Sequence, residues 1–260
     1  MRPSLALLPL LAAAPLATRL SAQPAAGEST RLLRQPTVSR THIAFVYAGD
    51  VWVVPRAGGD ARRLTSFPGV ESQPRLSPDG RTVAFTGEYA GNQDVYVVPT
   101  DGGDPKRLTW HPGADVVRGW SPDGNRVVFT SGRTNAPTPY PKLWSVATAG
   151  GLETPLPIPR AYKGGYSADG RRIAYQAIAP SDVEWRNYRG GQAQPIRLMN
   201  TGDLSMTRVP WTNSVDTDPV WLNNRVYFIS DRDGHECVWS VKADGVGKTF
   251  TADTNEREAH

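Results

Sequence analysis

A turn sequence that recurs along the chain limits the fold more than any other feature. Ser77-Pro78-Asp79-Gly80 returns as Ser121-Pro122-Asp123-Gly124 after 44 residues, and as Ser167-Ala168-Asp169-Gly170 after a further 46. An alternating apolar run follows each copy, as in Val83-Ala84-Phe85. Because Asp-Gly pairs tolerate the positive φ angles of tight hairpins, each copy predicts a turn between antiparallel strands. The repeat assigns a structural role to Asp79, Gly80, Asp123, Gly124, Asp169 and Gly170.

A later strand of the repeat carries one aromatic residue at a constant position. Paired glycines follow this strand in three of the units, for example Gly58-Gly59, and the sequence Arg-Leu-Thr follows in two. The regular recurrence of the aromatic residue favours packing between neighbouring repeats over a carbohydrate- or ligand-binding platform. The aromatic residues assigned to this structural position are Trp52, Tyr96, Trp144 and Trp239.

Four short strands that repeat every 40–50 residues are typical of β-propeller blades. The composition agrees, because 25 glycines and 23 prolines in 260 residues suit a chain dense in turns. The sequence therefore predicts an all-β fold, a β-propeller of four-stranded antiparallel blades. About five blades are expected, at residues 34–65, 74–109, 117–155, 164–208 and 217–251, with a linker at 23–33 and a polar tail at 252–260.

The first 22 residues have the layout of a secretory signal peptide. Arg2 precedes an apolar stretch from Leu5 to Ala17, and the small residues Ser21 and Ala22 come before the expected cleavage point. The apolar stretch is short and contains two prolines, which disfavours a transmembrane anchor. We therefore expect an exported protein, periplasmic or secreted, with no membrane span after cleavage.

The repeat resembles the WD-like repeat of TolB-type propellers. Three segments are similar to tricorn-type proteases: Pro36–Pro55, Trp185–Gly191, and Asp218–Gly234. This resemblance implies the N-terminal six-bladed propeller of a serine peptidase of the S41 type. In that family a second propeller, a PDZ-like domain and catalytic α/β domains follow. The resemblance therefore implies a truncated chain, with an incomplete six-bladed ring and no catalytic residues of its own.

An arginine- and aromatic-rich insert interrupts the fourth repeat. Arg186, Tyr188 and Arg189 lie in this insert and are the candidate peptide-binding residues. Arginine forks suit carboxylates, so these side chains could hold the end or the backbone of a peptide. Alternatively, the same residues wedge between blades, with Trp185 buried and Gly190-Gly191 turning the chain back.

Side chains that could carry chemistry are sparse. The four histidines lack metal-ligand spacing, and no nucleophile-elbow motif is present, so we expect no catalytic residue, metal or cofactor. A Ser–His–Asp triad assembled from distant positions stays open as an alternative. The aspartates at 216, 218, 231 and 233 are read as turn residues in preference to Ca²⁺ ligands. Cys237 is read as a small apolar residue in preference to a nucleophile.

Three functions are compatible with these features. The first is the non-catalytic propeller of an exported tricorn-like serine protease, which gates or recruits peptide or unfolded-protein substrates and is inactive alone. Its partners would be the downstream propeller, PDZ and catalytic domains. The alternative is a TolB-like scaffold that binds a protein partner in the periplasm. A sugar-binding or glycan-cleaving propeller is disfavoured, because the repeats place no carboxylates at equivalent positions. Nucleic acid is not expected, since the net charge of +4 falls to +2 without the leader.

Overall fold

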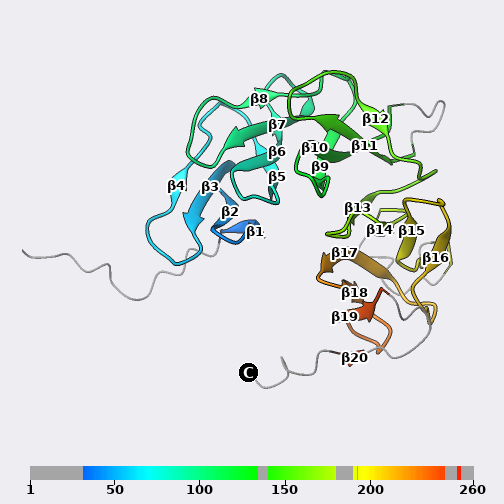
Figure 1. The fold of residues 1–260 in the computed structure, drawn as a ribbon. Coiled ribbons are helices and arrows are strands. Elements are labelled where there is room, and N and C mark those ends of the chain that lie inside the picture. The colour runs from blue at the N-terminus through cyan, green and yellow to red at the C-terminus, as the bar shows by residue number, and fades with distance from the viewer. Residues whose placement is uncertain (1–31, 134–139, 180–189, 192, 244–250, 253–260) are drawn as a thin grey trace, which may run out of the picture. The chain divides into compact units, whose positions relative to one another are not determined.

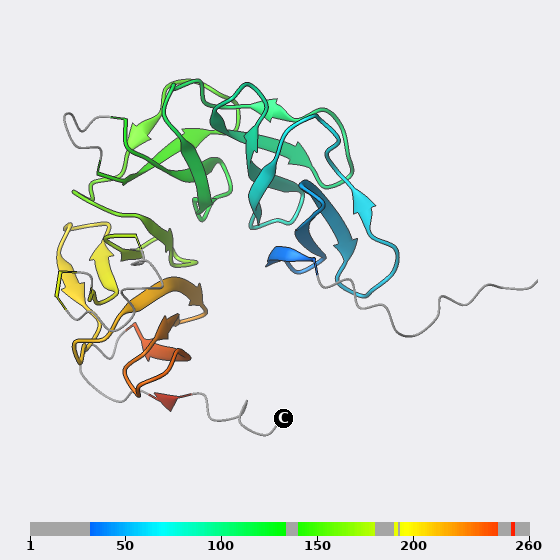
Figure 2. The ribbon, with the colours of Figure 1, turned by 180° about the vertical axis from the view of Figure 1, so that it is seen from behind.

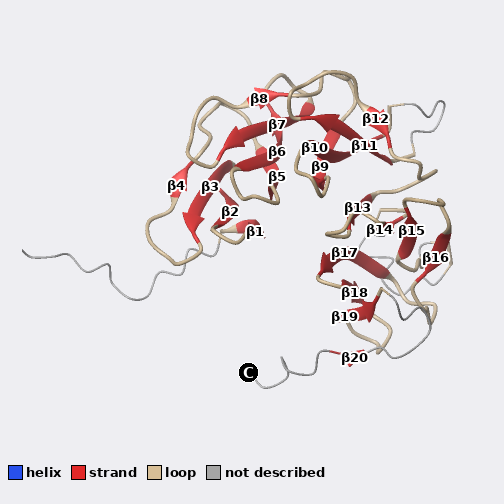
Figure 3. Ribbon diagram, in the orientation of Figure 1, coloured by secondary structure: helices blue, strands red, loops and turns tan. Residues whose placement is uncertain are grey.

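A computed structural model of the chain describes residues 32–133, 140–179, 190–191, 193–243 and 251–252. Every regular element in these ranges is a β-strand (Figure 3), which confirms the predicted all-β class. All of these residues belong to one structural unit, Leu32–His260. Within them, no helix has the length and apolar character needed to cross a membrane.

The described strands form five four-stranded sheets, and each sheet is built from four strands that are consecutive in sequence. All pairs within the sheets are antiparallel, as predicted for propeller blades. Blades 1 and 2 contain β1 (Arg34–Val38), β2 (His42–Tyr47), β3 (Asp50–Pro55), β4 (Arg62–Arg63), β5 (Glu71–Leu76), β6 (Thr82–Glu88), β7 (Gln93–Pro99) and β8 (Lys106–Arg107). Blade 3 contains β9 (Asp115–Trp120), β10 (Arg126–Ser131), β11 (Lys142–Ala147) and β12 (Thr154–Pro155). Blades 4 and 5 contain β13 (Lys163–Tyr166), β14 (Arg172–Gln176), β15 (Arg197–Asn200), β16 (Met206–Arg208), β17 (Asp216–Leu222), β18 (Arg225–Ser230), β19 (Cys237–Lys242) and β20 (Thr251–Ala252).

Consecutive blades contact one another through their first strands. β1 contacts β5, β5 contacts β9, β9 contacts β13, and β13 contacts β17 (Figure 1). Seen from behind, the five sheets again follow one another in chain order (Figure 2). We call these five first strands the inner strands, because the first strands of propeller blades line the central channel.

The repeated turn has the same hydrogen bonds in each copy. The Ser77 hydroxyl donates to Asp79 Oδ1 at 2.6 Å, and the Arg81 N–H donates to the same oxygen at 3.0 Å. Gly80 has a φ of 74°, a conformation that glycine adopts at little cost. The hydroxyl and backbone hydrogen bonds stabilise the carboxylate and lower the pKa of Asp79. Ser121–Asp123 and Ser167–Asp169 repeat this geometry at 2.5 and 2.6 Å, so the turn closes β5–β6, β9–β10 and β13–β14 alike.

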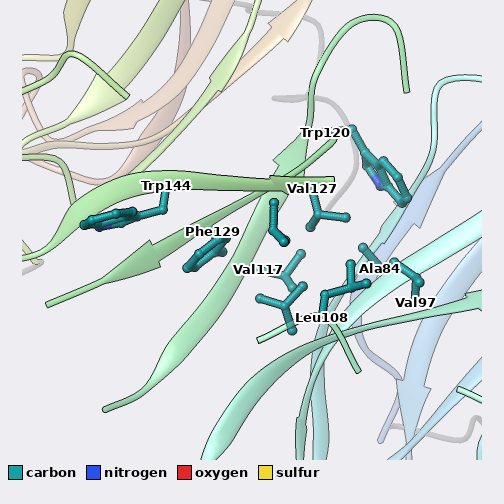
Figure 4. Packing of buried hydrophobic residues seen from close by; sticks show 10 residues of the cluster. Ala84, Val97, Leu108, Val117, Trp120, Val127, Phe129 and Trp144 are labelled. Carbon is teal, nitrogen blue, oxygen red and sulfur yellow. The ribbon is translucent and has the colours of Figure 1, made fainter. Parts of the chain in front are cut away.

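Apolar side chains fill the space between neighbouring blades. Figure 4 shows Phe129, Trp144 and their neighbours of blade 3 gathered with residues of blade 2, such as Leu108. Tyr96 lies in the cluster between blades 1 and 2, and Trp239 in the cluster between blades 4 and 5. Each cluster joins residues from two sheets, so stacking buries faces that a single sheet would expose to water.

Trp52, the aromatic residue of blade 1, has different surroundings. It is half-buried and packs edge-on against Tyr47, with ring centroids 5.9 Å apart. The side of blade 1 that faces blade 2 instead presents Ala44 and Val53. Trp52 therefore lies on the opposite face of its sheet, where no described blade covers it.

The threonine of the Arg-Leu-Thr sequence forms a hydrogen bond with the backbone of the third strand in two blades. The Thr109 side chain is buried, accepts the Val95 N–H at 3.0 Å and donates to Asp94 Oδ1 at 3.2 Å. Thr65 repeats this role in blade 1, where it accepts the Val51 N–H at 2.9 Å. A backbone donor that the short outer strand does not reach is thus satisfied by a side chain.

Candidate functional site

The predicted peptide-binding residues Arg186, Tyr188 and Arg189 lie outside the described residues. The described residues on either side of the insert are held together. The Gln194 side chain accepts the Ile178 N–H at 2.9 Å and donates to the Ile178 carbonyl at 2.9 Å. The base of the insert is therefore fixed to blade 4.

A hollow of about 380 Å³ lies beside this base. It has a mixed lining of cationic, aromatic and apolar side chains, among them Arg160, Arg197, Tyr175, Ile178 and Met206. The Tyr175 hydroxyl contacts Met206 Sδ at 3.4 Å within this lining. The hollow includes Gly191 of the insert that the sequence selects.

Two of the histidines and one of the candidate aspartates form local hydrogen bonds. His42 Nδ1 lies 2.9 Å from the Thr41 hydroxyl, and His111 Nδ1 accepts the Gly113 N–H at 2.9 Å. The Asp231 side chain accepts the Val215 N–H at 2.8 Å, and its carbonyl accepts the Gly234 N–H at 2.9 Å within the turn after β18. In the described ranges, no three His, Cys, Asp or Glu side chains gather where they could hold a metal ion. Cys237 is half-buried beside the apolar cluster of blades 4 and 5.

Two buried arginines join strands within blades 3 and 5. Arg133 pairs with Asp115, and Arg232 pairs with Asp216 at 3.1 Å. Arg232 also lies over the Phe228 and Trp239 rings, at 5.1 and 5.0 Å from their centroids. Sequence reasoning missed these pairs. A serine two residues before the arginine, in Ser131-Gly132-Arg133 and Ser230-Asp231-Arg232, is the signal that could have revealed them.

Three cationic side chains gather on consecutive inner strands, and we call them the inner-strand cations: Arg75 on β5, Arg118 on β9 and Lys163 on β13. Arg75 Nε donates to the Arg118 carbonyl at 3.2 Å. Arg118 Nε donates to the Thr130 hydroxyl at 2.9 Å, and its guanidinium lies 4.8 Å from the Tyr162 ring centroid.

The inner-strand cations repel one another. Burial, followed by the charge of Arg118, lowers the pKa of Arg75 to about 10. Burial, followed by the charges of Arg75 and Arg118, lowers the pKa of Lys163 to about 8. Asp218 on β17 forms an ion pair with Lys163, and this contact favours the charged ammonium. Among the described residues, one carboxylate thus forms an ion pair within a group of three cations.

The repeated turns border a second hollow, of about 260 Å³. Its lining includes Pro78, Pro122, Trp120, Tyr166 and Trp221, which come from blades 2 to 5. The Trp120 indole N–H donates to the Arg75 carbonyl at 2.9 Å, whereas the buried Trp221 indole N–H has no hydrogen-bond partner among the described residues. The turns and inner strands thus bring aromatic and cationic groups that are far apart in sequence close together in space.

The five four-stranded sheets and their stacking define a β-propeller. The chain matches the tricorn protease N-terminal beta propeller domain over residues 30–259. The chain therefore belongs to this family, and the predicted tricorn resemblance is confirmed at that level.

Two curated relatives cover most of this chain. Tricorn protease homolog 1 of Streptomyces coelicolor is 34% identical over 221 residues, which make up 82% of this chain and 20% of the relative. The tricorn protease of Thermoplasma acidophilum is 30% identical over 227 residues, again 82% of this chain and 20% of the relative. The chain thus spans about a fifth of the length of the curated relatives it matches.

Solved structures show the same fold. The crystal structure of the tricorn protease aligns with a TM-score of 0.69 and 25% identity, over 84% of this chain and 22% of that chain. A putative TolB from Agrobacterium tumefaciens aligns with a TM-score of 0.68 and 22% identity, over 85% of this chain and 79% of that chain. The TolB likeness concerns the fold alone.

Proposed function

We propose that this chain is the non-catalytic propeller of an exported tricorn-like serine protease, and that it gates or recruits peptide substrates for downstream catalytic domains. The observation that carries the proposal is the family match, which extends over residues 30–259 and so includes every described blade. Proteolysis would then belong to segments other than these blades, as it does in the S41-type architecture that the sequence resembles.

The proposal also includes a sixth blade that continues the ring, further domains after it, and export of the protein. A sixth blade would cover the apolar side chains that blade 5 exposes, among them Val220 and Val238. A PDZ-like domain and a serine-bearing catalytic domain would follow it. The leader at residues 1–22 would direct the protein out of the cytoplasm.

The coding sequence that follows codon 260 tests this architecture directly. A sixth blade, a PDZ-like segment and a serine-bearing α/β domain in the same frame would support the proposal. A stop codon followed by unrelated genes would contradict it and favour the TolB-like scaffold.

The role in substrate handling is tested in the full protein with the Arg189→Ala variant. We expect slower hydrolysis of an unfolded protein such as reduced casein, with the thermal midpoint unchanged. Arg208→Ala is the matched control, because Arg208 is an exposed arginine on β16. Loss of soluble protein in Arg189→Ala would indicate the wedge role for the insert and contradict the binding role.

The TolB-like scaffold alternative predicts a different binding behaviour for the isolated chain. A TolB-like scaffold would retain a periplasmic protein partner and show no preference for peptides. Affinity capture from periplasmic extract, followed by competition with an unfolded polypeptide, distinguishes the two. Displacement of the captured material by the polypeptide supports peptide recruitment, and retention supports the scaffold.

A further inference from the structure

Neighbouring blades lack the two inner-strand arginines at the equivalent positions. Arg75 pairs across the ladder with Ala84, and the residues at the same ladder position in blades 3 and 4 are Gly119 and Gly165, which pair with Val128 and Ala174. Arg118 lies at a bulge of β9, where β5 has Pro74 and β17 has Pro219. Neighbouring blades therefore form the same sheet with small or apolar residues at these positions.

The charges of Arg75 and Arg118 also lack carboxylate partners. Some arginines elsewhere in the described chain have such partners: Arg107 pairs with Asp94 at 2.6 Å, and Arg232 pairs with Asp216. Others, such as Arg126 and Arg172, donate to hydroxyl and carbonyl oxygens instead. Among the described residues, neither Arg75 nor Arg118 forms an ion pair, and Asp218 is engaged by Lys163. A half-buried group of cations with one acid is costly unless an anion joins it.

There is room for such an anion along the inner strands. A Cβ added at Gly119 or at Gly165 would meet no atom within 4 Å, apart from its chain neighbours. These two glycines occupy the ladder position of Arg75 in the next two blades. The two glycines therefore leave open space along the inner strands that carry Arg118 and Lys163.

We propose that the inner-strand cations bind side-chain carboxylates of acidic peptides. Arg75 already donates to the Pro74 carbonyl at 2.8 Å and to Gln73 Oε1 at 3.2 Å, so each of its two terminal nitrogens keeps one N–H for a carboxylate. Arg118 donates to Thr130 through Nε, and its terminal nitrogens can hold a carboxylate through two parallel hydrogen bonds, while Lys163 adds a point charge. Asp218 holds the Lys163 ammonium and repels a second carboxylate, which limits how closely acidic residues can follow one another. The proposal rests on the proposed peptide-handling function and adds a preference for glutamate- and aspartate-rich segments.

The test uses a fluorescein-labelled hexaglutamate peptide, acetylated and amidated so that only side chains carry charge, with hexaglutamine as the neutral control. Anisotropy of the full chain at about 50 mM NaCl should show hexaglutamate binding at least tenfold tighter than hexaglutamine, and about 500 mM NaCl should weaken it. Equal binding of the two peptides would overturn the acidic preference while leaving peptide recruitment intact. Binding of neither peptide, with inorganic phosphate still bound, would mean a small-anion site only and also overturn it.

Three variants locate the site. Arg118→Gln should weaken hexaglutamate binding at least tenfold, whereas Arg208→Gln, which removes the same charge from β16, should change it less than twofold. Asp218→Asn should tighten binding, and a merely structural role would not produce this gain. Equal losses of hexaglutamate affinity in Arg118→Gln and Arg208→Gln would indicate that binding depends on net charge alone, and would overturn the site. If Arg118→Gln does not fold, unchanged binding in Arg75→Gln and Asp218→Asn would overturn the site.

Discussion

Arg133 and Asp115 form an ion pair in blade 3 whose side chains are 9% and 0% exposed. The same guanidinium contacts Glu153 at 3.0 Å and lies 5.2 Å from the Trp144 ring centroid. Burial alone would lower the pKa of Arg133, but the hydrogen bonds with Asp115 and Glu153 outweigh it and raise the pKa. The cation is therefore fixed in its charged form, and it links Asp115 on β9 to Glu153 beside β12, the two edge strands of the blade 3 sheet.

Replacing this arginine should be costly. Arg133→Ala leaves the buried Asp115 carboxylate without a counter-charge, and we expect a loss of about 3–5 kcal/mol in the free energy of unfolding. Urea unfolding followed by tryptophan fluorescence measures the loss. Arg63→Ala is the control, because Arg63 pairs with Asp50 but its side chain is 46% exposed, and its loss should be about 1 kcal/mol or less. Similar losses in both variants would contradict the dominant role of the buried pair.

The first Asp-Gly turn should tolerate no side chain at its glycine. Gly80 has a φ of 74°, and a Cβ there would lie 2.8 Å from Ser39 Oγ and 2.9 Å from Thr41 Oγ1. We expect Gly80→Ala to lower the free energy of unfolding by about 1–3 kcal/mol, from backbone strain and displacement of these hydroxyls. In Gly119→Ala, where the space is open and φ is ordinary, the thermal midpoint should change by less than about 2 °C.

Peptide binding at the inner-strand cations should weaken as pH rises through 8. Lys163 is charged below its pKa of about 8 and neutral above it. The charged groups that face it are Arg118 on β9, Asp218 on β17 and, one strand further, Arg75 on β5, while its neighbour on β14 is the uncharged Gln176. We expect the affinity for hexaglutamate to fall about tenfold between pH 7 and 9. Lys163→Met should remove this dependence, and a persistent slope in that variant would assign it to another group.

Blade 5 should promote association of the isolated chain. Val220, Leu222 and Val238 are 59%, 57% and 50% exposed. Apolar side chains gathered on an uncovered sheet face favour contact with another surface. We expect the elution volume in size-exclusion chromatography to decrease as protein concentration rises. Val238→Lys should shift the chain towards monomer, and an elution volume independent of concentration in the unmodified chain would contradict the expectation.

The repeat made the fold predictable because local chemistry sets its turns. Ser77, Asp79 and Gly80 fix one hairpin through their own hydrogen bonds, and the same residue types fix the next two. Alternating apolar residues then determine which face of each strand is buried. The four-stranded antiparallel blade and the order of its strands therefore follow from turn residues and apolar residues that lie only a few positions apart in sequence.

The group of inner-strand cations could not be predicted from the sequence because its geometry depends on β-bulges. Gln73 and Asp218, each followed by a proline, have positive φ angles of 52° and 54° at bulges of β5 and β17. A bulge inserts residues into one strand and changes the direction of the side chains beside it. Arg75, Arg118 and Lys163 are separated by more than 40 residues in sequence, so only the stacking of blades brings them together.

Each blade draws its four strands from one continuous stretch of chain, so no hydrogen-bonded ladder is shared between blades. Such a molecule is nearly one-dimensional in its energetics: each unit has its own stability, and each interface adds a term for the neighbour. Folding can then begin in any blade and spread along the chain, without waiting for distant segments to meet. Duplication or loss of a whole blade would leave every remaining ladder intact, which is a simple route by which genes can change the number of blades.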